Sequence, residues 1–208
     1  MQVNRFVQCK DFPCLDVQHE SYVTPGIDLV PENVSMIVIS EAAPANPADH
    51  YYGSPDSLFQ QTSLLAFQDA GAGVSSFQEV VDLGIYFTTA IKCAKTGYGV
   101  TSESIERCSH LLEQEIALFP NVKVYLLMGD VAIKAFNLVA RRSGGGRVIP
   151  AGSTYKIRKD EFYFKGRRVF PSYLQAGPSF FIEKSKRRMI AEDITQALKY
   201  VGAAPSPH

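Results

Sequence analysis

The sequence contains no tryptophan, only four cysteines and no apolar run long enough to cross a bilayer. A membrane-spanning helix needs about 20 consecutive apolar residues, whereas the most apolar stretches, such as VKVYLLMG, are far shorter. The N-terminal MQVNRFVQCK also lacks the apolar core of a secretory signal. These absences predict a cytoplasmic protein with no membrane partner. We expect residues 1–208 to form a single domain and a monomer.

Two glycine-rich motifs are missing as well. The sequence contains neither GxGxxG nor GxxxxGK[ST], the loops that hold a dinucleotide or a nucleoside triphosphate at a helix N-terminus. The main sequence evidence for a dinucleotide-dependent enzyme or a P-loop NTPase is therefore missing.

Each half of the chain is poor in charge of one sign. Residues 1–133 contain 6 Lys or Arg against 16 Asp or Glu, whereas residues 134–208 contain 15 against 5. The net charge of zero therefore hides an acidic and a basic half. Such asymmetry suggests a face for nucleic acid or for a membrane surface, although chance segregation of solvated charges would give the same counts.

What the sequence does contain is an alternation of strand-like and helix-like segments. Apolar runs predict strands at 34–40, 84–91, 122–128 and 168–173. Helical periodicity and capping residues predict helices at 55–70, 76–82, 101–119, 130–139 and 179–200. This order predicts an α/β fold with three αβα layers around a mostly parallel four-stranded sheet. Residues 1–33 should be irregular, and residues 154–165 should form an inserted β-hairpin.

The predicted sheet also locates a binding site. Ligands bind such sheets outside the carboxyl ends of the strands. The segments after Ser40, Thr89 and Tyr173 and the turn at Gly129 follow the four predicted strands. They should therefore converge on one crevice.

The cysteines fall into two pairs, Cys9 with Cys14 and Cys93 with Cys108. In a reducing compartment four cysteines indicate a metal more often than disulfides, and four thiolates can hold zinc or a [4Fe–4S] cluster. The wide second pair fits zinc less well, because zinc ribbons use closely spaced pairs. Four inert core cysteines are the alternative.

A colinear set of short motifs runs through the chain. It comprises Ser40-Glu-Ala-Ala-Pro-Ala45, Tyr86-Phe-Thr-Thr-Ala-Ile-Lys-Cys93, Glu106 with Cys108, Lys123-Val-Tyr-Leu-Leu-Met-Gly129, Pro171-Ser-Tyr173 and Gly177-Pro-Ser179. In this order the motifs resemble those of the uracil-DNA glycosylase superfamily, most closely its iron–sulfur branch. The resemblance implies a DNA glycosylase of base-excision repair, with DNA as partner and a [4Fe–4S] cluster on the four cysteines.

Several positions depart from the pattern of that branch. The uracil-reading Asn of the family is Thr89 here, and its histidine falls on Leu174 or Gly177. The segment His50-Tyr-Tyr-Gly-Ser-Pro-Asp-Ser-Leu-Phe59 is instead similar to the first-motif loop of the mismatch and hypoxanthine branches. Strict specificity for uracil is therefore not expected.

Hydrolysis of an N-glycosidic bond needs a flipped base, a stabilised leaving anion and a positioned water. Tyr51 and Tyr52 are candidates to stack on the base, and Thr89 offers one hydroxyl that both donates and accepts. The alternative for both tyrosines is loop packing.

Acid–base candidates lie in the same loop. Asp49, in preference to Glu41, is expected to orient the water, and His50 is a candidate donor to the leaving base. The alternative for His50 is a surface or capping role.

The basic half offers candidates for DNA binding. Ser179 could bind a phosphate at the start of the last helix, followed by Lys184, Lys186, Arg187 and Arg188. The 154–165 segment adds Lys156, Arg158 and Lys159, for which the resemblance implies no role.

Three hypotheses follow. The first is an iron–sulfur DNA glycosylase acting on a damaged or deaminated base. The second is a nucleic-acid-binding relative that kept the fold and lost cleavage, because the motif Asn and His are absent. The third is an enzyme acting on free nucleotides or nucleosides.

Overall fold

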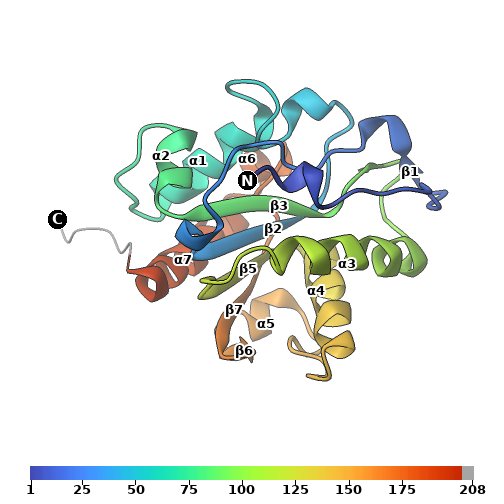
Figure 1. Cartoon of the computed structure of the whole chain (residues 1–208). Coiled ribbons are helices and arrows are strands. Elements are labelled where there is room, and N and C mark those ends of the chain that lie inside the picture. The colour runs from blue at the N-terminus through green and yellow to red at the C-terminus, as the bar shows by residue number, and fades with distance from the viewer. Residues whose placement is uncertain (203–208) are drawn as a thin grey trace.

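Five strands form the central sheet of the computed structural model, which describes residues 1–202 (Figure 1). In their order across the sheet these strands are β3 (Ile85–Ile91), β2 (Met36–Ala42), β5 (Val124–Met128), β7 (Arg167–Ser172) and β6 (Phe162–Phe164). The first four are parallel to one another, and β6 is antiparallel to β7. The predicted α/β class and mostly parallel sheet are confirmed, with β6 as a fifth strand at the edge.

The apolar runs of the sequence form strands whose residues are nearly all buried. All seven residues of β3 and all five of β5 are buried, and Ile39 of β2 is in register with Thr88 on one side and Leu127 on the other. Strands covered on both faces need apolar residues at every position rather than at alternate ones. The continuous runs are the sequence signature of this arrangement.

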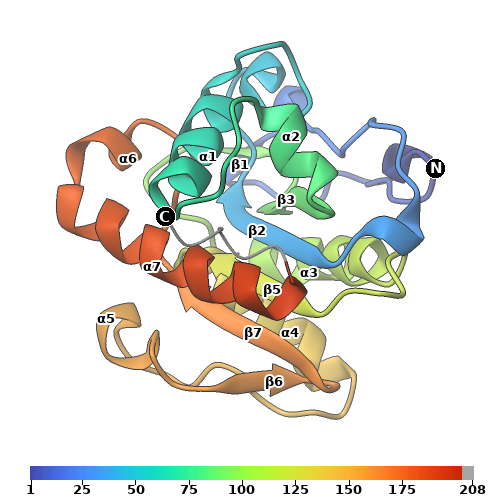
Figure 2. The ribbon, with the colours of Figure 1, turned by 90° about the vertical axis from the view of Figure 1, so that its left-hand side faces the viewer.

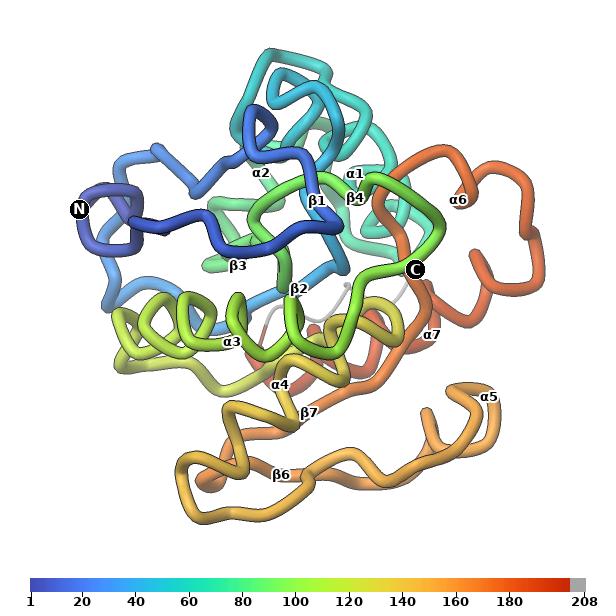
Figure 3. The backbone as a smooth tube through the Cα atoms, turned by 90° about the vertical axis from the view of Figure 1, so that its right-hand side faces the viewer, coloured from blue at the N-terminus to red at the C-terminus, as the bar shows by residue number. Residues whose placement is uncertain are grey.

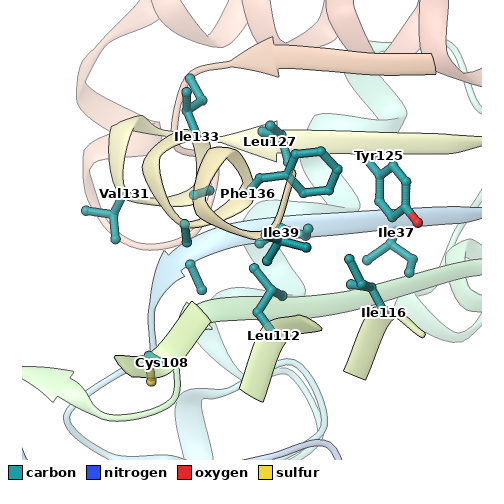
Figure 4. Close-up of a cluster of buried hydrophobic side chains, with 14 of the residues drawn as sticks. Ile37, Ile39, Cys108, Leu112, Ile116, Tyr125, Leu127, Val131, Ile133 and Phe136 are labelled. Carbon is teal, nitrogen blue, oxygen red and sulfur yellow. The ribbon is translucent and has the colours of Figure 1, made fainter. Parts of the chain in front are cut away.

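Two layers of helices cover the sheet (Figure 2). One face carries α1 (Leu58–Asp69), α2 (Phe77–Asp82) and α7 (Lys184–Val201), and the other carries α3 (Ser102–Ile116) and α4 (Asp130–Arg142). Figure 4 shows side chains of α3 and α4 meeting those of the sheet, among them Leu112, Phe136 and Ile39. Within residues 1–202, none of the helices combines the length and apolarity that crossing a membrane requires.

Side-chain caps begin α1, α2 and α3. The hydroxyl of Ser76 accepts the Glu79 N–H at the start of α2, and that of Thr101 accepts the Ser104 N–H at the start of α3. Ser57 does the same for α1. Each such bond pairs one of the N–H groups that a helix leaves free at its first turn.

The N-terminal segment is mostly irregular, as predicted, with short 3-10 turns at Val3–Arg5 (η1), His19–Ser21 (η2) and Pro31–Asn33 (η3). Its strand β1 (Val17–Gln18) pairs antiparallel with β4 (Ala94–Lys95), which follows β3. This small second sheet fastens the segment that carries Cys9 and Cys14 beside the one that carries Cys93.

The hairpin predicted for residues 154–165 is placed wrongly. Residues Thr154–Ile157 form a helical turn, α5, and the hairpin connects β6 to β7 instead. Its two turn residues, Lys165 and Gly166, both have positive φ, at 50° and 77°. Tight hairpin turns need positive φ at these positions, which glycine adopts without strain. The middle of the predicted 154–165 hairpin, Lys159-Asp160, contains no glycine.

The C-terminal helix is also divided. Residues Ser179–Ile182 form the short α6, and Glu183, with φ −96° and ψ 75°, interrupts the helix before α7 begins. Residues Lys184 to Arg188 therefore lie on the first turns of a separate helix.

Candidate functional site

A crevice of about 350 Å³ lies outside the carboxyl ends of β2, β5 and β7. Glu41 of β2, Gly129 after β5, and Ser172 and Tyr173 at the end of β7 line it. The remaining wall comes from residues 152–154 and from α6 and α7. Three of the four segments expected to converge do so, whereas Thr89 of β3 is not among the lining residues.

Glu41 is one of three acids that line this crevice, the others being Asp130 and Glu183. It is the one that lies on a strand of the sheet. It pairs with Lys95 at 3.0 Å, and the Val131 N–H in the first turn of α4 donates to its Oε1 at 3.4 Å. Gly129 has a positive φ of 104°, which favours glycine. A Cβ at this position would also lie 2.6 Å from Oε1 of Glu41, so a larger residue would displace the Glu41 side chain. The Glu41 carboxylate thus lies between the Lys95 ammonium and the first turn of α4.

The other acidic candidate, Asp49, belongs to the 3-10 turn η4 (Pro47–Asp49) and is half-buried. It is not among the residues that line the crevice. The preference for Asp49 over Glu41 thus gains no support from the position of the two side chains, and it stays a prediction.

His50 is buried against the rings of Tyr51, Tyr52 and Phe59. Burial, and to a lesser extent the positive charge of Lys92, lowers the pKa of His50 to about 3. The imidazole is therefore neutral at pH 7. Within residues 1–202 neither ring nitrogen has a hydrogen-bond partner, an uncommon situation for buried polar atoms.

The two loop tyrosines point into the core rather than toward the crevice. The Tyr51 hydroxyl donates to Ser40 Oγ at 2.9 Å and accepts from the Gln175 amide at 3.0 Å. The Tyr52 hydroxyl accepts the Phe87 N–H at 2.9 Å. Burial raises the pKa of both phenols, so both stay protonated. Their position matches the loop-packing alternative, and neither lines the crevice.

Thr89 lies beside Ser40 in the parallel register and is fully buried. Its hydroxyl has no hydrogen-bond partner within the described part of the chain. Its carbonyl accepts from Lys92 Nζ at 2.7 Å. Thr89 therefore has one free polar atom near the carboxyl end of β3.

Lys92, which the sequence analysis did not single out, connects this region to the cysteines. Its ammonium forms a buried ion pair with Glu115 of α3 and donates to Thr88 Oγ1 at 2.7 Å. Its backbone N–H donates to Cys108 Sγ at 3.4 Å. The sequence did contain a signal for a buried acid here. Glu115 lies on the same helix face as Leu112 and interrupts its stripe of mostly apolar residues.

All four cysteines line one small cavity, whose other walls include Phe12, Tyr22 and Ile91. Burial, followed by the neighbouring thiols, raises the pKa of Cys93 to about 12, and burial raises that of Cys108 to about 11. Four soft sulfur donors around one cavity suit a metal centre chemically. Within residues 1–202, however, no three His, Cys, Asp or Glu side chains are grouped closely enough to hold a metal ion. The cluster therefore stays a prediction.

The basic candidates divide between the crevice and the outer surface. Ser179, Lys186 and Arg187 line the crevice, whereas Lys184 and Arg188 do not. Arg187 pairs with Asp69 of α1 and lies 4.9 Å from the Phe180 ring centre. Because α6 has only four residues, the expected phosphate site at its first turn lacks the dipole of a full helix.

A second buried ion pair lies behind the crevice and was missed by the sequence analysis. Asp193 of α7 accepts from Arg158 Nε at 3.1 Å and from the Ser172 hydroxyl at 2.6 Å. Desolvation raises the pKa of Asp193 to about 6, against the opposing effects of these two partners. The partners are far apart in sequence, and the predicted hairpin gave no reason to bring Arg158 to α7.

A parallel sheet with a polar crevice at its carboxyl edge and a basic helix beside it defines an α/β protein with an enzyme-like site. A model of the uracil DNA glycosylase superfamily matches residues 27–198, and the chain belongs to that superfamily. It is 37% identical over 137 residues to a type-5 uracil-DNA glycosylase of Thermus thermophilus. The alignment covers 63% of this chain and 60% of that protein, which is less than two thirds of the relative's length.

Proposed function

We propose that this protein hydrolyses the N-glycosidic bond of a flipped deaminated or damaged base in DNA, uracil or a related base. The observation that carries the proposal is the crevice, which residues of the superfamily motifs line at the carboxyl ends of β2, β5 and β7. Its volume of about 350 Å³ is near the lower end of the range for small-ligand sites, as suits a single base.

Glu41 is the carboxylate that we assign to the water and to the developing positive charge on the sugar. It lines the crevice and is held by Lys95 and by the first turn of α4. An ionised carboxylate beside the sugar stabilises an oxocarbenium-like transition state. Asp49, which is half-buried in η4, is the alternative.

His50 is the candidate donor to the leaving base. Its low pKa keeps the ring neutral, and a neutral imidazole still carries one N–H that can donate to a developing anion. Backbone N–H groups of the loop after Pro44 could add to this stabilisation, because donors fixed in advance cost no reorganisation during the reaction.

Thr89 stays the candidate for recognition of the base, because its buried hydroxyl has no hydrogen-bond partner within residues 1–202, although the residue does not line the crevice. One hydroxyl cannot reproduce the two-point contact of an amide with a base edge. Discrimination between similar bases depends on such paired polar groups, so we propose activity on several uracil-like bases rather than on uracil alone.

For the cofactor we propose a [4Fe–4S] cluster on Cys9, Cys14, Cys93 and Cys108. The support is that all four sulfurs line one cavity and that the matching relative is a glycosylase of the same superfamily. The cluster would hold the N-terminal segment against α3 and has no assigned step in hydrolysis. Anaerobically purified protein should show iron and the broad visible absorption of such clusters. Stoichiometric zinc without iron would overturn this assignment.

A catalytically impaired DNA-binding relative is the second candidate. The observation that favours it is the position of Tyr51 and Tyr52, whose hydroxyls are bound to core partners rather than presented to a substrate. Such a protein would keep salt-sensitive DNA binding without releasing any base.

The deciding experiment incubates the protein with duplexes that contain uracil, hypoxanthine or hydroxymethyluracil, and reveals abasic sites with alkali. We expect strand breaks at more than one of these bases. Glu41→Gln should lower the rate by about 10²–10⁴-fold. Glu32→Gln, at an exposed acid of η3 that does not line the crevice, should leave it unchanged. Loss of activity in Asp49→Asn but not in Glu41→Gln would exchange the two roles. No cleavage of any duplex, with DNA binding retained, would favour the second candidate.

A further inference from the structure

The segment between α4 and β6 forms one rim of the crevice, although it belongs to none of the motifs. Gly152, Ser153 and Thr154 line the crevice from this side. On the other side the wall comes from α6 and the start of α7. Figures 2 and 3 both show α5 and α6 at the same end of the molecule.

Arg158 holds this rim in place. Its side chain is 4% exposed and pairs with Asp193 and Glu192 of α7. It also donates to the Met189 carbonyl at 2.6 Å. Burying a guanidinium costs several kcal/mol unless its donors are paired, so each of these contacts restrains α5 relative to α7. The segment is thus a positioned element rather than a loose surface loop.

The outer side of the same turn presents an aromatic ring and two cations. Tyr155 is 70% exposed, and Lys156 and Lys159 are exposed as well. Among the ion pairs of residues 1–202, neither lysine has a partner. An exposed ring flanked by free ammonium groups is the combination on which proteins stack an unpaired base and bind its phosphates.

We propose that Tyr155, Lys156 and Lys159 form a subsite for an unpaired nucleotide that neighbours the one held in the crevice. The base stacks on Tyr155, and the two lysines contact its flanking phosphates. A base inside a duplex has both faces covered by its neighbours, so the subsite favours single-stranded or locally opened DNA. The inference rests on the proposed DNA function and adds to it the form of DNA that is preferred.

The absence of tryptophan from the chain makes a direct test available. Tyr155→Trp places the chain's one tryptophan in the subsite, where it can be excited at a longer wavelength than the tyrosines. Tyr98→Trp places it instead at a fully exposed position in the acidic half. Titration with a short single-stranded oligodeoxythymidine should quench the fluorescence of Tyr155→Trp to saturation and leave that of Tyr98→Trp unchanged. Only the tryptophan at position 155 is expected to stack on a base, so the difference in quenching between the two variants does not depend on hydrolysis.

Affinity measurements complete the test. Tyr155→Ala should bind the single strand roughly tenfold more weakly, within the range expected for loss of one stacked base. Tyr155→Phe should bind like the unaltered protein because the ring is retained, and Tyr98→Ala is the matched control. Lys156→Gln and Lys159→Gln should each reduce the slope of log K against log salt by about 0.7.

The outcomes separate this inference from the proposed function. If the unaltered protein binds DNA but Tyr155→Ala binds it equally well, the subsite is refuted and the DNA function stands. An equal loss of affinity for a fully paired duplex would refute the preference for unpaired DNA. If the unaltered protein binds neither form of DNA, both the subsite and the function on which it rests are wrong.

Discussion

The cysteine cavity and the crevice are both built on residues that follow strands of the central sheet, yet they differ in construction. The cavity is small, its walls are buried or partly buried except at His19, and the fully buried Lys92–Glu115 pair lies next to it. The crevice is open, and partly exposed charges such as Glu41 and Arg187 line it. Buried charges without partners are costly, whereas exposed ones are not. The first region should therefore determine stability and the second should be free to exchange its contacts with a ligand.

The largest effect is expected from removing Glu115. Glu115→Ala leaves the Lys92 ammonium buried without its counter-charge and deprives the Tyr86 hydroxyl of its acceptor. We expect the free energy of unfolding to fall by about 3–5 kcal/mol, measured by urea denaturation. Glu113→Ala removes a half-exposed acid of the same helix that pairs with Arg142 and should cost far less. Similar losses for both variants would contradict the contrast between the two regions.

A smaller effect is expected from Asp193, behind the crevice, and it depends on pH. Its pKa of about 6 in the folded protein lies above the value of about 3.9 in an unfolded chain. The folded state then binds more protons between these values, so this group's contribution to stability is lost as the pH rises through that window. The loss amounts to about 3 kcal/mol.

Comparison with Asp193→Asn isolates this contribution. The difference in unfolding free energy, unaltered protein minus variant, should fall from about pH 4 to about pH 6 and stay level above it. A difference that rises with pH would mean that Arg158 and Ser172 outweigh desolvation and hold the pKa low.

The parts of this fold that could be predicted from sequence are those decided by local pattern. The buried runs of β2, β3 and β5 and the caps at Ser76 and Thr101 depend on neighbouring residues only. The crevice was predictable as a place, because parallel strands must end at one edge of the sheet.

The direction of individual side chains was not predictable. Tyr51 and Tyr52 lie in a segment whose sequence is typical of a surface loop. Their hydroxyls bind core partners that are distant in the chain, Gln175 for Tyr51 and Phe87 for Tyr52, and no local pattern predicts these contacts. The Arg158–Asp193 pair likewise joins segments that no local pattern connects. Charge pairs between distant segments become visible only when the sheet has brought those segments together.

Helix caps offer a test in which the two regions should not differ. Thr101→Ala removes the cap of α3, which carries Cys108, and Ser57→Ala removes the cap of α1. Each variant loses one hydroxyl acceptor and should lose about 1 kcal/mol of stability in urea denaturation. Ser57→Ala should lose somewhat more, because the buried Ser57 hydroxyl also donates to the His50 carbonyl at 2.8 Å. A much larger loss for Thr101→Ala would show that loss of the cap also disturbs neighbouring contacts at the start of α3. One such contact is the bond from the Thr101 backbone N–H to Asp16, which the substitution does not itself remove.

The smallest effect on stability, and the clearest separation of stability from binding, is expected from Arg187 in the crevice. Its pair with Asp69 is about one third exposed on both sides, and such pairs contribute about 0–1 kcal/mol. Arg187→Gln should therefore unfold at nearly the same urea concentration as the unaltered protein. If the residue contacts a phosphate in the crevice, the same substitution should weaken DNA binding at low salt and flatten its salt dependence, because one fewer counterion is released.

The matched control is Asp69→Asn, which removes the same ion pair while leaving the cation free, so it should bind DNA at least as well as the unaltered protein. Equal weakening of DNA binding by both variants would mean that the ion pair positions α7 against α1. Arg187 would then have a structural role, like the buried pair beside the cysteines, rather than a direct contact with the ligand.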